Sequence, residues 1–310
     1  MKRILIAMAL LFIAAAADAQ KVRIDLQPSG EYLFAKRDTC DLYMTVYDPA
    51  YKSDKPTVIF VFGGGFIMGD RNARAYLPWF KRYTEEGYRI ITIDYRLGLK
   101  GAGSNVGIGT IETIYNAVEM GVEDLYSATA FIIDNAEALG VDPAKLVISG
   151  SSAGAMISLQ AEWHLCNRSG HADMLPKDFR YAGVMAFSGA IFSREGRIRF
   201  AQDPSPVLFF HGTNDRIVTY NRIALFKNRM EGAKPLAKIF AKKGYNYNIY
   251  RFEGNQHEIA SSFLESFPEQ IHFLEQNVAC GQKRIVDATV HDPSIKIWPV
   301  NSTRDIYRNN

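Results

Sequence analysis

The stretch Val147-Ile148-Ser149-Gly150-Ser151-Ser152-Ala153-Gly154-Ala155-Met156 decides the fold of this chain. The apolar run from Leu146 to Ile148 leads into it and is typical of a buried strand, whereas the residues from Ala155 to Leu165 favour a helix. Ser152 has one glycine two residues before it and another two residues after it, which matches the pattern Gly-x-Ser-x-Gly. A strand, a sharp turn and a helix are the context in which such a serine is exposed above a sheet. We therefore predict that Ser152 is a nucleophile.

Two neighbouring serines are excluded by the same spacing. Neither Ser149 nor Ser151 has glycine at both flanking positions. The helix that follows Ser152 would also direct the N–H groups of its first turn, and the positive end of its dipole, at negative charge that develops near the serine. The turn thus predicts a nucleophile together with part of its electrostatic support.

Short apolar runs and helical stretches alternate along the chain from about residue 57 to residue 277. This alternation predicts an α/β fold with a mostly parallel central sheet and helices on both faces. Two earlier segments, 22–27 and 42–47, alternate apolar and polar residues and predict an antiparallel N-terminal edge. The predicted strands of the central sheet are 57–62, 88–94, 146–148, 181–187, 207–210 and 246–252. The segments predicted as helices near the C-terminal half are 217–230, 236–243 and 259–277.

A serine nucleophile needs a base, and the base needs a carboxylate that orients it. In open α/β sheets the functional loops follow the carboxyl ends of the strands. Asp215 lies just beyond the strand predicted at 207–210, and His257 lies just beyond the one at 246–252. The chain order Ser152, Asp215, His257 is an order known from serine hydrolases with a parallel sheet. We predict Asp215 as the acid and His257 as the base.

Other candidates fit less well. His211 lies at a strand end, where we expect it to pack beneath the loop of the acid, and Glu253 shares a loop with His257 and comes too late in the chain. The remaining histidines precede the acid, fall inside a predicted helix or lie in the tail: His164, His171, His272 and His291.

The reaction that such residues perform also needs an oxyanion hole, because the attacked carbonyl oxygen becomes negative and must meet backbone N–H groups that already point at it. One such group is predicted to come from Ala153, the residue after the nucleophile. The others are predicted to come from the loop Gly63-Gly64-Gly65, since this glycine-rich loop follows an early buried strand and glycine lets the backbone approach a ligand closely.

Taken together, these motifs resemble an α/β-hydrolase of the esterase/lipase type. The resemblance is carried by Phe62-Gly63-Gly64-Gly65-Phe66, Asp94-Tyr95-Arg96, Gly150-Ser151-Ser152-Ala153-Gly154, His211-Gly212-Thr213-Asn214-Asp215 and His257, and it spans residues 42–277. It implies the α/β-hydrolase fold, a triad of Ser152, Asp215 and His257, and oxyanion contacts from Gly64, Gly65 and Ala153. The chain departs from many relatives at Phe62, where they have histidine, and at Ser151, where they have an acidic residue.

The N-terminus is expected to be a targeting segment. Lys2 and Arg3 precede an apolar stretch that is too short to span a bilayer comfortably, and Ala17-Asp18-Ala19 gives a small-x-small cleavage pattern. We predict a signal peptide at residues 1–19, a catalytic domain at 20–279, and a C-terminal extension at 280–310 that adds a hairpin or wraps the domain. The mature protein is expected to be secreted or periplasmic.

Composition narrows the set of partners. The formal net charge is +3, which favours neither nucleic acid nor an anionic membrane surface, and stable membrane insertion after cleavage is not expected. No metal-ligand cluster or nucleotide-binding loop is visible, so no cofactor is expected. Three cysteines do not make a disulfide framework, and a bridge between Cys40 and Cys280 stays open as an alternative to free thiols.

The predicted activity is the hydrolysis of carboxylic esters, with a small-molecule or polysaccharide-linked ester as substrate. Acetyl and feruloyl esters on polysaccharide fit secretion, and small lipids remain an alternative. A serine peptidase of the same fold is a second candidate function, and a non-catalytic binding protein on this scaffold is a third. The sequence leaves the acyl chain length, the alcohol and the oligomeric state open.

Overall fold

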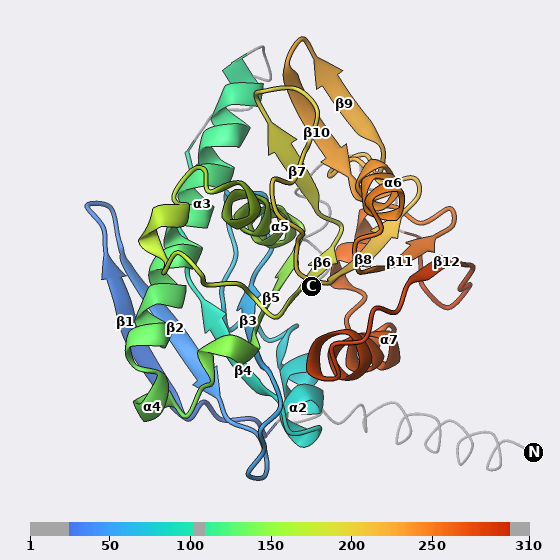
Figure 1. The fold of residues 1–310 in the computed structure, drawn as a ribbon. Coiled ribbons are helices and arrows are strands. Elements are labelled where there is room, and N and C mark those ends of the chain that lie inside the picture. Colours follow the sequence, from blue (N-terminus) through green and yellow to red (C-terminus); the bar gives the residue numbers. More distant parts are fainter. Residues whose placement is uncertain (1–24, 102–108, 298–310) are drawn as a thin grey trace, which may run out of the picture.

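The central feature of the computed structural model, which describes residues 25–101 and 109–297, is a nine-stranded sheet in the order β1-β2-β4-β3-β5-β6-β8-β11-β12 (Figure 1). Its strands are β1 (Gly30–Lys36), β2 (Asp41–Tyr47), β3 (Thr57–Val61), β4 (Arg89–Ile93), β5 (Leu146–Ser151), β6 (Gly183–Phe187), β8 (Val207–Gly212), β11 (Tyr247–Phe252) and β12 (Val286–Val290). All pairings from β4 to β12 are parallel, and β1 and β2 form an antiparallel edge. The predicted fold class is confirmed.

Helices cover both faces of this sheet (Figure 1). They are α2 (Leu77–Glu85), α3 (Gly109–Asp134), α4 (Ala136–Leu139), α5 (Ala153–Asn167), α6 (Ala233–Lys243) and α7 (Phe267–Phe273), the last continued by a π-helical turn over Leu274–Ala279. The indole of Trp79 in α2 donates to Gln270 in α7 at 2.8 Å, and the hydroxyl of Tyr126 in α3 donates to the carbonyl of Ala161 in α5 at 2.6 Å. Two pairs of helices are thereby joined by buried hydrogen bonds.

Adjacent residues of β8 show how the chain divides its side chains between the two faces. The Phe210 ring stacks on Phe187, which in turn contacts Trp79 of α2, whereas the Phe209 ring packs edge-on against Phe240 of α6. Side chains alternate across a strand, so a strand that is covered on both sides must be apolar throughout. Every residue of β3, β5, β6 and β8 is buried.

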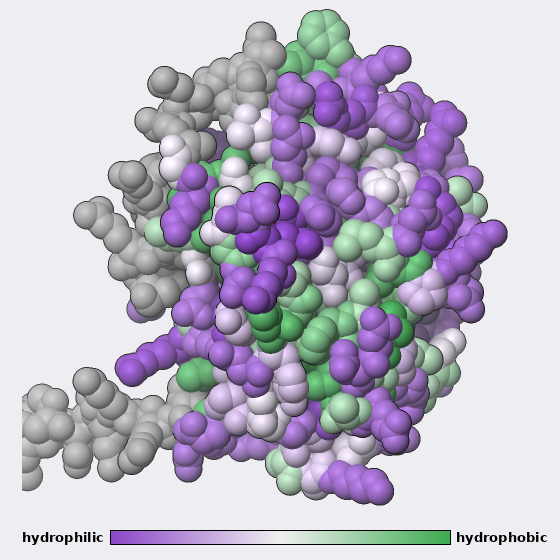
Figure 2. All heavy atoms as spheres, turned by 90° about the vertical axis from the view of Figure 1, so that its left-hand side faces the viewer, coloured by the Kyte–Doolittle hydropathy of each residue, from purple (hydrophilic) through white to green (hydrophobic). Residues whose placement is uncertain are grey.

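The face that carries β1, β2 and α3 is mostly hydrophilic, with hydrophobic residues gathered near its centre between hydrophilic ones (Figure 2). The edge strand β1 contributes charged residues such as Glu31 and Lys36 to its exposed positions. Charge on an edge strand opposes pairing with another chain.

Among the described residues, no helix is long and apolar enough to cross a bilayer.

The helix predicted at 217–230 is wrong. These residues instead contain β9 (Arg222–Leu225) and the start of β10 (Asn228–Gly232), which join β7 (Ala190–Ser193) in a three-stranded antiparallel sheet. Phe226 at the turn has a φ of +54°, and its side chain is 93% exposed. A left-handed residue ends any helix, and pairing with β7 supplies the backbone hydrogen bonds that a helix would otherwise provide.

The C-terminal segment contributes to the main sheet, because β12 pairs in parallel with β11. The division at residue 280 between domain and extension stays a prediction. The proposed signal peptide and the cleavage site near Ala19 lie outside the described residues. All three cysteines are free: Cys40 and Cys280 are exposed, and Cys166 is buried.

Glu162 is a buried carboxyl group in α5 whose ionisation lowers stability. One carboxylate oxygen accepts from the backbone of Ser205 at 2.8 Å and from the thiol of Cys166 at 3.4 Å, and the other has no hydrogen-bond partner among the described residues. Burial raises the pKa of Glu162 above its usual value. The folded state therefore holds this proton more tightly than the unfolded state, and stability falls as pH rises from the unfolded pKa through the folded one.

We predict that Glu162→Gln raises the melting temperature at pH 8 and that the gain shrinks toward pH 4, where the unfolded carboxyl, with its pKa of about 4.3, also becomes protonated. Thermal unfolding across this pH range measures the effect. Glu137→Gln, at an exposed position of α4, is the matched control and should leave the pH profile unchanged. An equal gain at both pH values would contradict the prediction.

Candidate active site

Ser152 lies at the turn between β5 and α5, in strained backbone geometry with φ at +52° and ψ at −114°. The turn is crowded on both sides by backbone. A Cβ on Gly150 would lie 2.2 Å from the carbonyl of Gly154, and a Cβ on Gly154 would lie 2.0 Å from the carbonyl oxygen of Val61 in β3. Both glycines are thus required by close packing, and the strain is held by the strand and helix on either side.

Ser152, His257 and Asp215 are brought together by three loops at the carboxyl edge of the sheet. Nε2 of His257 lies 2.7 Å from Oγ of Ser152, and Nδ1 lies 2.7 Å from Oδ2 of Asp215. The three side chains are separated by 63 and 42 positions in the sequence and are all buried or nearly so. The distances allow a proton to move from the serine to the imidazole while the carboxylate holds the ring.

The Asp215 carboxylate is buried but well provided with donors. Its Oδ1 accepts from the backbone N–H groups of Ile217 at 2.9 Å and Val218 at 3.1 Å. Burial by itself raises the pKa of Asp215, but the neighbouring imidazoles of His257 and His211 outweigh it and hold this pKa well below its usual range. The carboxylate therefore stays ionised wherever the protein is folded near neutral pH.

Two further contacts involve this site, and the sequence predicted the first but not the second. Nε2 of His211 lies 3.3 Å from Oδ2 of Asp215 and 3.0 Å from the carbonyl oxygen of Val218, so this histidine packs against the acid itself. The hydroxyl of Ser151 donates to the carbonyl of Ala260 at 2.8 Å, which ties the turn at Ser152 to the 3-10 helix His257–Ser261. The chain position of His211 at a strand end was the signal for the first contact, and no sequence signal pointed to the second.

In the glycine loop after β3, Gly63-Gly64-Gly65, one backbone N–H group is hydrogen-bonded and two have no acceptor among the described residues. Gly63 makes a backbone hydrogen bond with the hydroxyl of Tyr76, whose pKa burial raises to about 12. Within the described residues, the backbone N–H groups of Gly64, Gly65 and Ala153 have no acceptor. Gly64 has φ at +139°, and a Cβ there would lie 1.6 Å from the carbonyl oxygen of Met68. The loop therefore offers donors in the conformation that only glycine adopts readily.

Phe62 is buried beneath this loop, as its apolar side chain requires. Its ring packs on Tyr95 with centroids 4.5 Å apart, and the Tyr95 hydroxyl donates to the Phe62 carbonyl at 3.1 Å. The loop thus rests on an aromatic pair.

The rival histidines lie elsewhere. His164 contacts Glu119 at 2.9 Å and Ser169 at 2.8 Å on the helical layer formed by α3 and α5, and His272 lies in α7. Glu253 is exposed at the rim of a different cavity. No group of three His, Cys, Asp or Glu side chains among the described residues is arranged to hold a metal ion.

Two models of known protein families match this chain. The model of the phospholipase/carboxylesterase family matches residues 111–275, which is more than half of the chain. The chain belongs to the phospholipase/carboxylesterase family. A second family model, BD-FAE, matches residues 41–169, which include the glycine loop and the nucleophile turn. The predicted membership of the esterase/lipase-type α/β-hydrolases is confirmed.

Individual relatives of this phospholipase/carboxylesterase chain match it only in part. Gut esterase 1 of Caenorhabditis elegans is 32% identical over 114 residues, which cover 37% of this chain and 19% of that protein. The bile salt-activated lipase of Homo sapiens is 30% identical over 129 residues, covering 38% of this chain and 16% of the lipase. The matches thus span about a fifth of these relatives' length or less.

Among solved structures, a thermophilic esterase from Thermogutta terrifontis superposes with a TM-score of 0.56 at 22% identity. The superposition covers 81% of this chain and 92% of that one. This likeness shows the shared fold.

We predict that Gly154→Ala lowers the melting temperature strongly, because its methyl group would overlap the Val61 carbonyl. Overpacking of this kind costs about 1–3 kcal/mol or more. Thermal unfolding by circular dichroism measures it. Gly196→Ala is the control, since a Cβ there meets nothing within 4 Å although φ is +98°. If the two variants melt alike, the close packing of the turn does not limit stability.

Proposed function

We propose that this chain is a carboxylic-ester hydrolase in which Ser152 is the nucleophile, His257 the base and Asp215 the acid. The observation that carries the proposal is the unbroken contact from the serine hydroxyl through the imidazole to the carboxylate, at 2.7 Å for each step. Family membership supports the ester substrate. A serine peptidase of the same fold remains the alternative, and a non-catalytic binding protein is a weaker one because all three triad positions are filled.

In the proposed reaction, Nε2 of His257 takes the proton of Ser152 as Oγ attacks the ester carbonyl carbon. Collapse of the tetrahedral intermediate breaks the bond to the alcohol oxygen, which leaves with the proton from His257, and an acyl-enzyme remains. A water molecule then gives its proton to His257 and attacks the acyl carbon, which releases the acid and restores Ser152. Asp215 stays ionised throughout and stabilises the imidazolium.

The negative oxygen of each tetrahedral intermediate is proposed to lie against the N–H groups of Gly64, Gly65 and Ala153. Their lack of acceptors among the described residues supports this role, since donors that are already oriented cost no reorganisation during the reaction. The first N–H groups of α5 add the favourable end of the helix dipole.

The substrate is proposed to be an acetyl or feruloyl ester on polysaccharide. The protein would meet this substrate outside the cytoplasm, after the N-terminal signal peptide has directed its secretion. The polar rather than lipid-like character of the cavity described below supports a hydroxylated substrate over small lipids. A panel of nitrophenyl esters of rising acyl length, together with acetylated xylan and aminoacyl nitroanilides, separates these possibilities.

We predict that Ser152→Ala lowers turnover of nitrophenyl acetate by about 10³-fold or more with the fold intact. Ser151→Ala is the matched control. It loses the hydrogen bond to Ala260, worth about 0.5–1.5 kcal/mol, and should keep most of the activity. Covalent labelling by a fluorophosphonate should follow the same pattern. If only the Ser151 variant lost labelling, the nucleophile would be Ser151, and the assignment to Ser152 would be wrong.

We predict that Gly64→Ala lowers the single-turnover acylation rate by about 10²- to 10³-fold, because the added Cβ would displace the loop from the Met68 carbonyl and move the donors. Gly196→Ala, strained in φ but uncrowded, should acylate at the wild-type rate. Normal acylation by the Gly64 variant would remove this loop from the oxyanion hole.

A further inference from the structure

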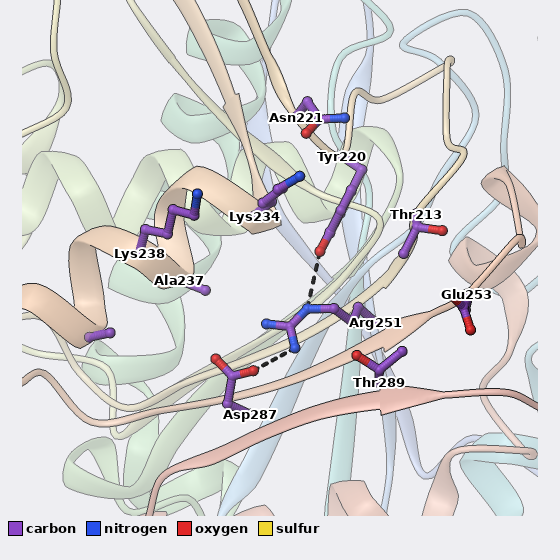
Figure 3. Close-up of a pocket in the computed structure, with 11 residues that line it drawn as sticks. Thr213, Tyr220, Asn221, Lys234, Ala237, Lys238, Arg251, Glu253, Asp287 and Thr289 are labelled. Carbon is purple, nitrogen blue, oxygen red and sulfur yellow. Dashed lines mark hydrogen bonds and ion pairs between the residues drawn. The ribbon is translucent and has the colours of Figure 1, made fainter.

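A cavity of about 510 Å³ lies beside the candidate active site, between α6 and the carboxyl-end loops of β8 and β11 (Figure 3). Its wall is made of hydroxyl, amide and charged side chains with two alanines of α6, and no large aliphatic side chain lines it. The volume falls in the range of about 300–1,000 Å³ that is typical of small-molecule sites. Such a lining offers several hydrogen-bonding groups to a hydroxylated ligand.

Two positive charges at this cavity have no carboxylate partner among the described residues. Lys234 and Lys238 lie one turn apart on α6 and both line the cavity, with the Lys234 side chain pointing toward Tyr220 (Figure 3). Like charges at this spacing destabilise a helix by about 0.2–0.5 kcal/mol. Lys234 also lies in the first turn of α6, where a cation opposes the helix dipole and where no acidic residue compensates it. Lys234 lies over the Tyr220 ring at 5.9 Å from its centroid, and both lysines are exposed, so their ammonium groups can reach an anion in the cavity.

The negative groups of the lining do not neutralise these lysines. Arg251 forms an ion pair with Asp287 and donates from Nε to the hydroxyl of Tyr220 at 3.1 Å (Figure 3). Asp287 therefore neutralises Arg251, which also lines the cavity, and not the two lysines. Glu253 is exposed at the rim. The lining keeps a positive surplus beside neutral groups that can bind sugar hydroxyls, namely Thr289 and Asn221.

The cavity shares its wall with the loops that hold the candidate triad. The Tyr220 ring packs against His211, which contacts Asp215, and the hydroxyl of Thr213 accepts from the backbone of Gly254 in the loop before His257. A ligand bound here would lie on the far side of the loops that carry the acid and the base. The wall of the cavity and two members of the candidate triad are therefore parts of the same loops.

We propose that this cavity binds a hexuronate unit of a glycan, with the carboxylate held by Lys234 and Lys238 and the ring hydroxyls by side chains such as Thr289. The inference deepens the proposed function, since it names an acidic glycan as the carrier of the ester. It is tested by binding, which does not depend on hydrolysis.

The experiment is calorimetric titration of the full-length protein with trigalacturonate, with neutral galactotriose as the matched sugar. We expect saturable binding of trigalacturonate alone. The double variant Lys234→Gln/Lys238→Gln should weaken it about a hundredfold or more, because two charge-assisted contacts to the carboxylate are lost. Thr289→Val removes a hydroxyl without changing charge and should weaken binding about two- to tenfold.

The matched control is Lys242→Gln/Lys243→Gln, which removes the same two charges from the exposed end of α6 outside the cavity. It should bind trigalacturonate like the wild type. Equal weakening in this control, equal binding of galactotriose, or displacement by inorganic phosphate at similar affinity would overturn the proposal. Wild-type protein that hydrolyses nitrophenyl acetate but binds no trigalacturonate refutes the cavity alone, and binding without hydrolysis refutes the proposed function alone.

Discussion

The contact between the start of α5 and the end of β3 is the constraint on which the rest of the site depends. Gly154 approaches the Val61 carbonyl so closely that no side chain fits between them. The helix can therefore begin directly beneath the strand ends, and Ser152 is forced into a left-handed conformation at the top of the turn. The favourable packing of two rigid elements compensates the strain of one residue, which is how backbone strain persists at functional sites.

Burial of Asp215 imposes a second requirement, since an isolated carboxylate in the interior is costly. Two backbone N–H groups of its own loop and the imidazoles of His257 and His211 offset that cost. The turn from Asp215 to Val218 thus stabilises the carboxylate directly, and it positions His257 only through that carboxylate. A loop that is ordered by its own carboxylate presents His257 with a fixed partner, and the orientation of the ring follows from it.

The sequence predicted the central sheet well because strands covered on both faces leave an unmistakable pattern, as in the five buried residues of β3. It predicted the positions of Asp215 and His257 for a related reason, since parallel strands bring their carboxyl ends to one edge. The hairpin of β9 and β10 was not predicted, because its apolar residues have helical spacing and that spacing describes only the local sequence. Pairing with β7, more than thirty positions earlier, decides the structure there. The Ser151–Ala260 bond and the polar cavity also join distant segments, and no local pattern encodes them.

The chemistry proposed for the edge of the sheet draws little on the identity of the substrate. The proposed donors are backbone groups, and the proposed triad would act on any ester carbonyl that reaches Ser152. Selectivity must then come from side chains that bind parts of the substrate away from the reacting carbon, because binding energy from such parts is what discriminates between esters of equal reactivity. In this chain the acid loop has two sides: Asp215 faces the imidazole, and Tyr220 faces the cationic cavity. One short segment thereby holds Asp215 against the imidazole and contributes Tyr220 to the wall of the cavity. Under the proposed role of the cavity, substitutions in it alter the choice of substrate while Ser152, His257 and Asp215 keep their geometry.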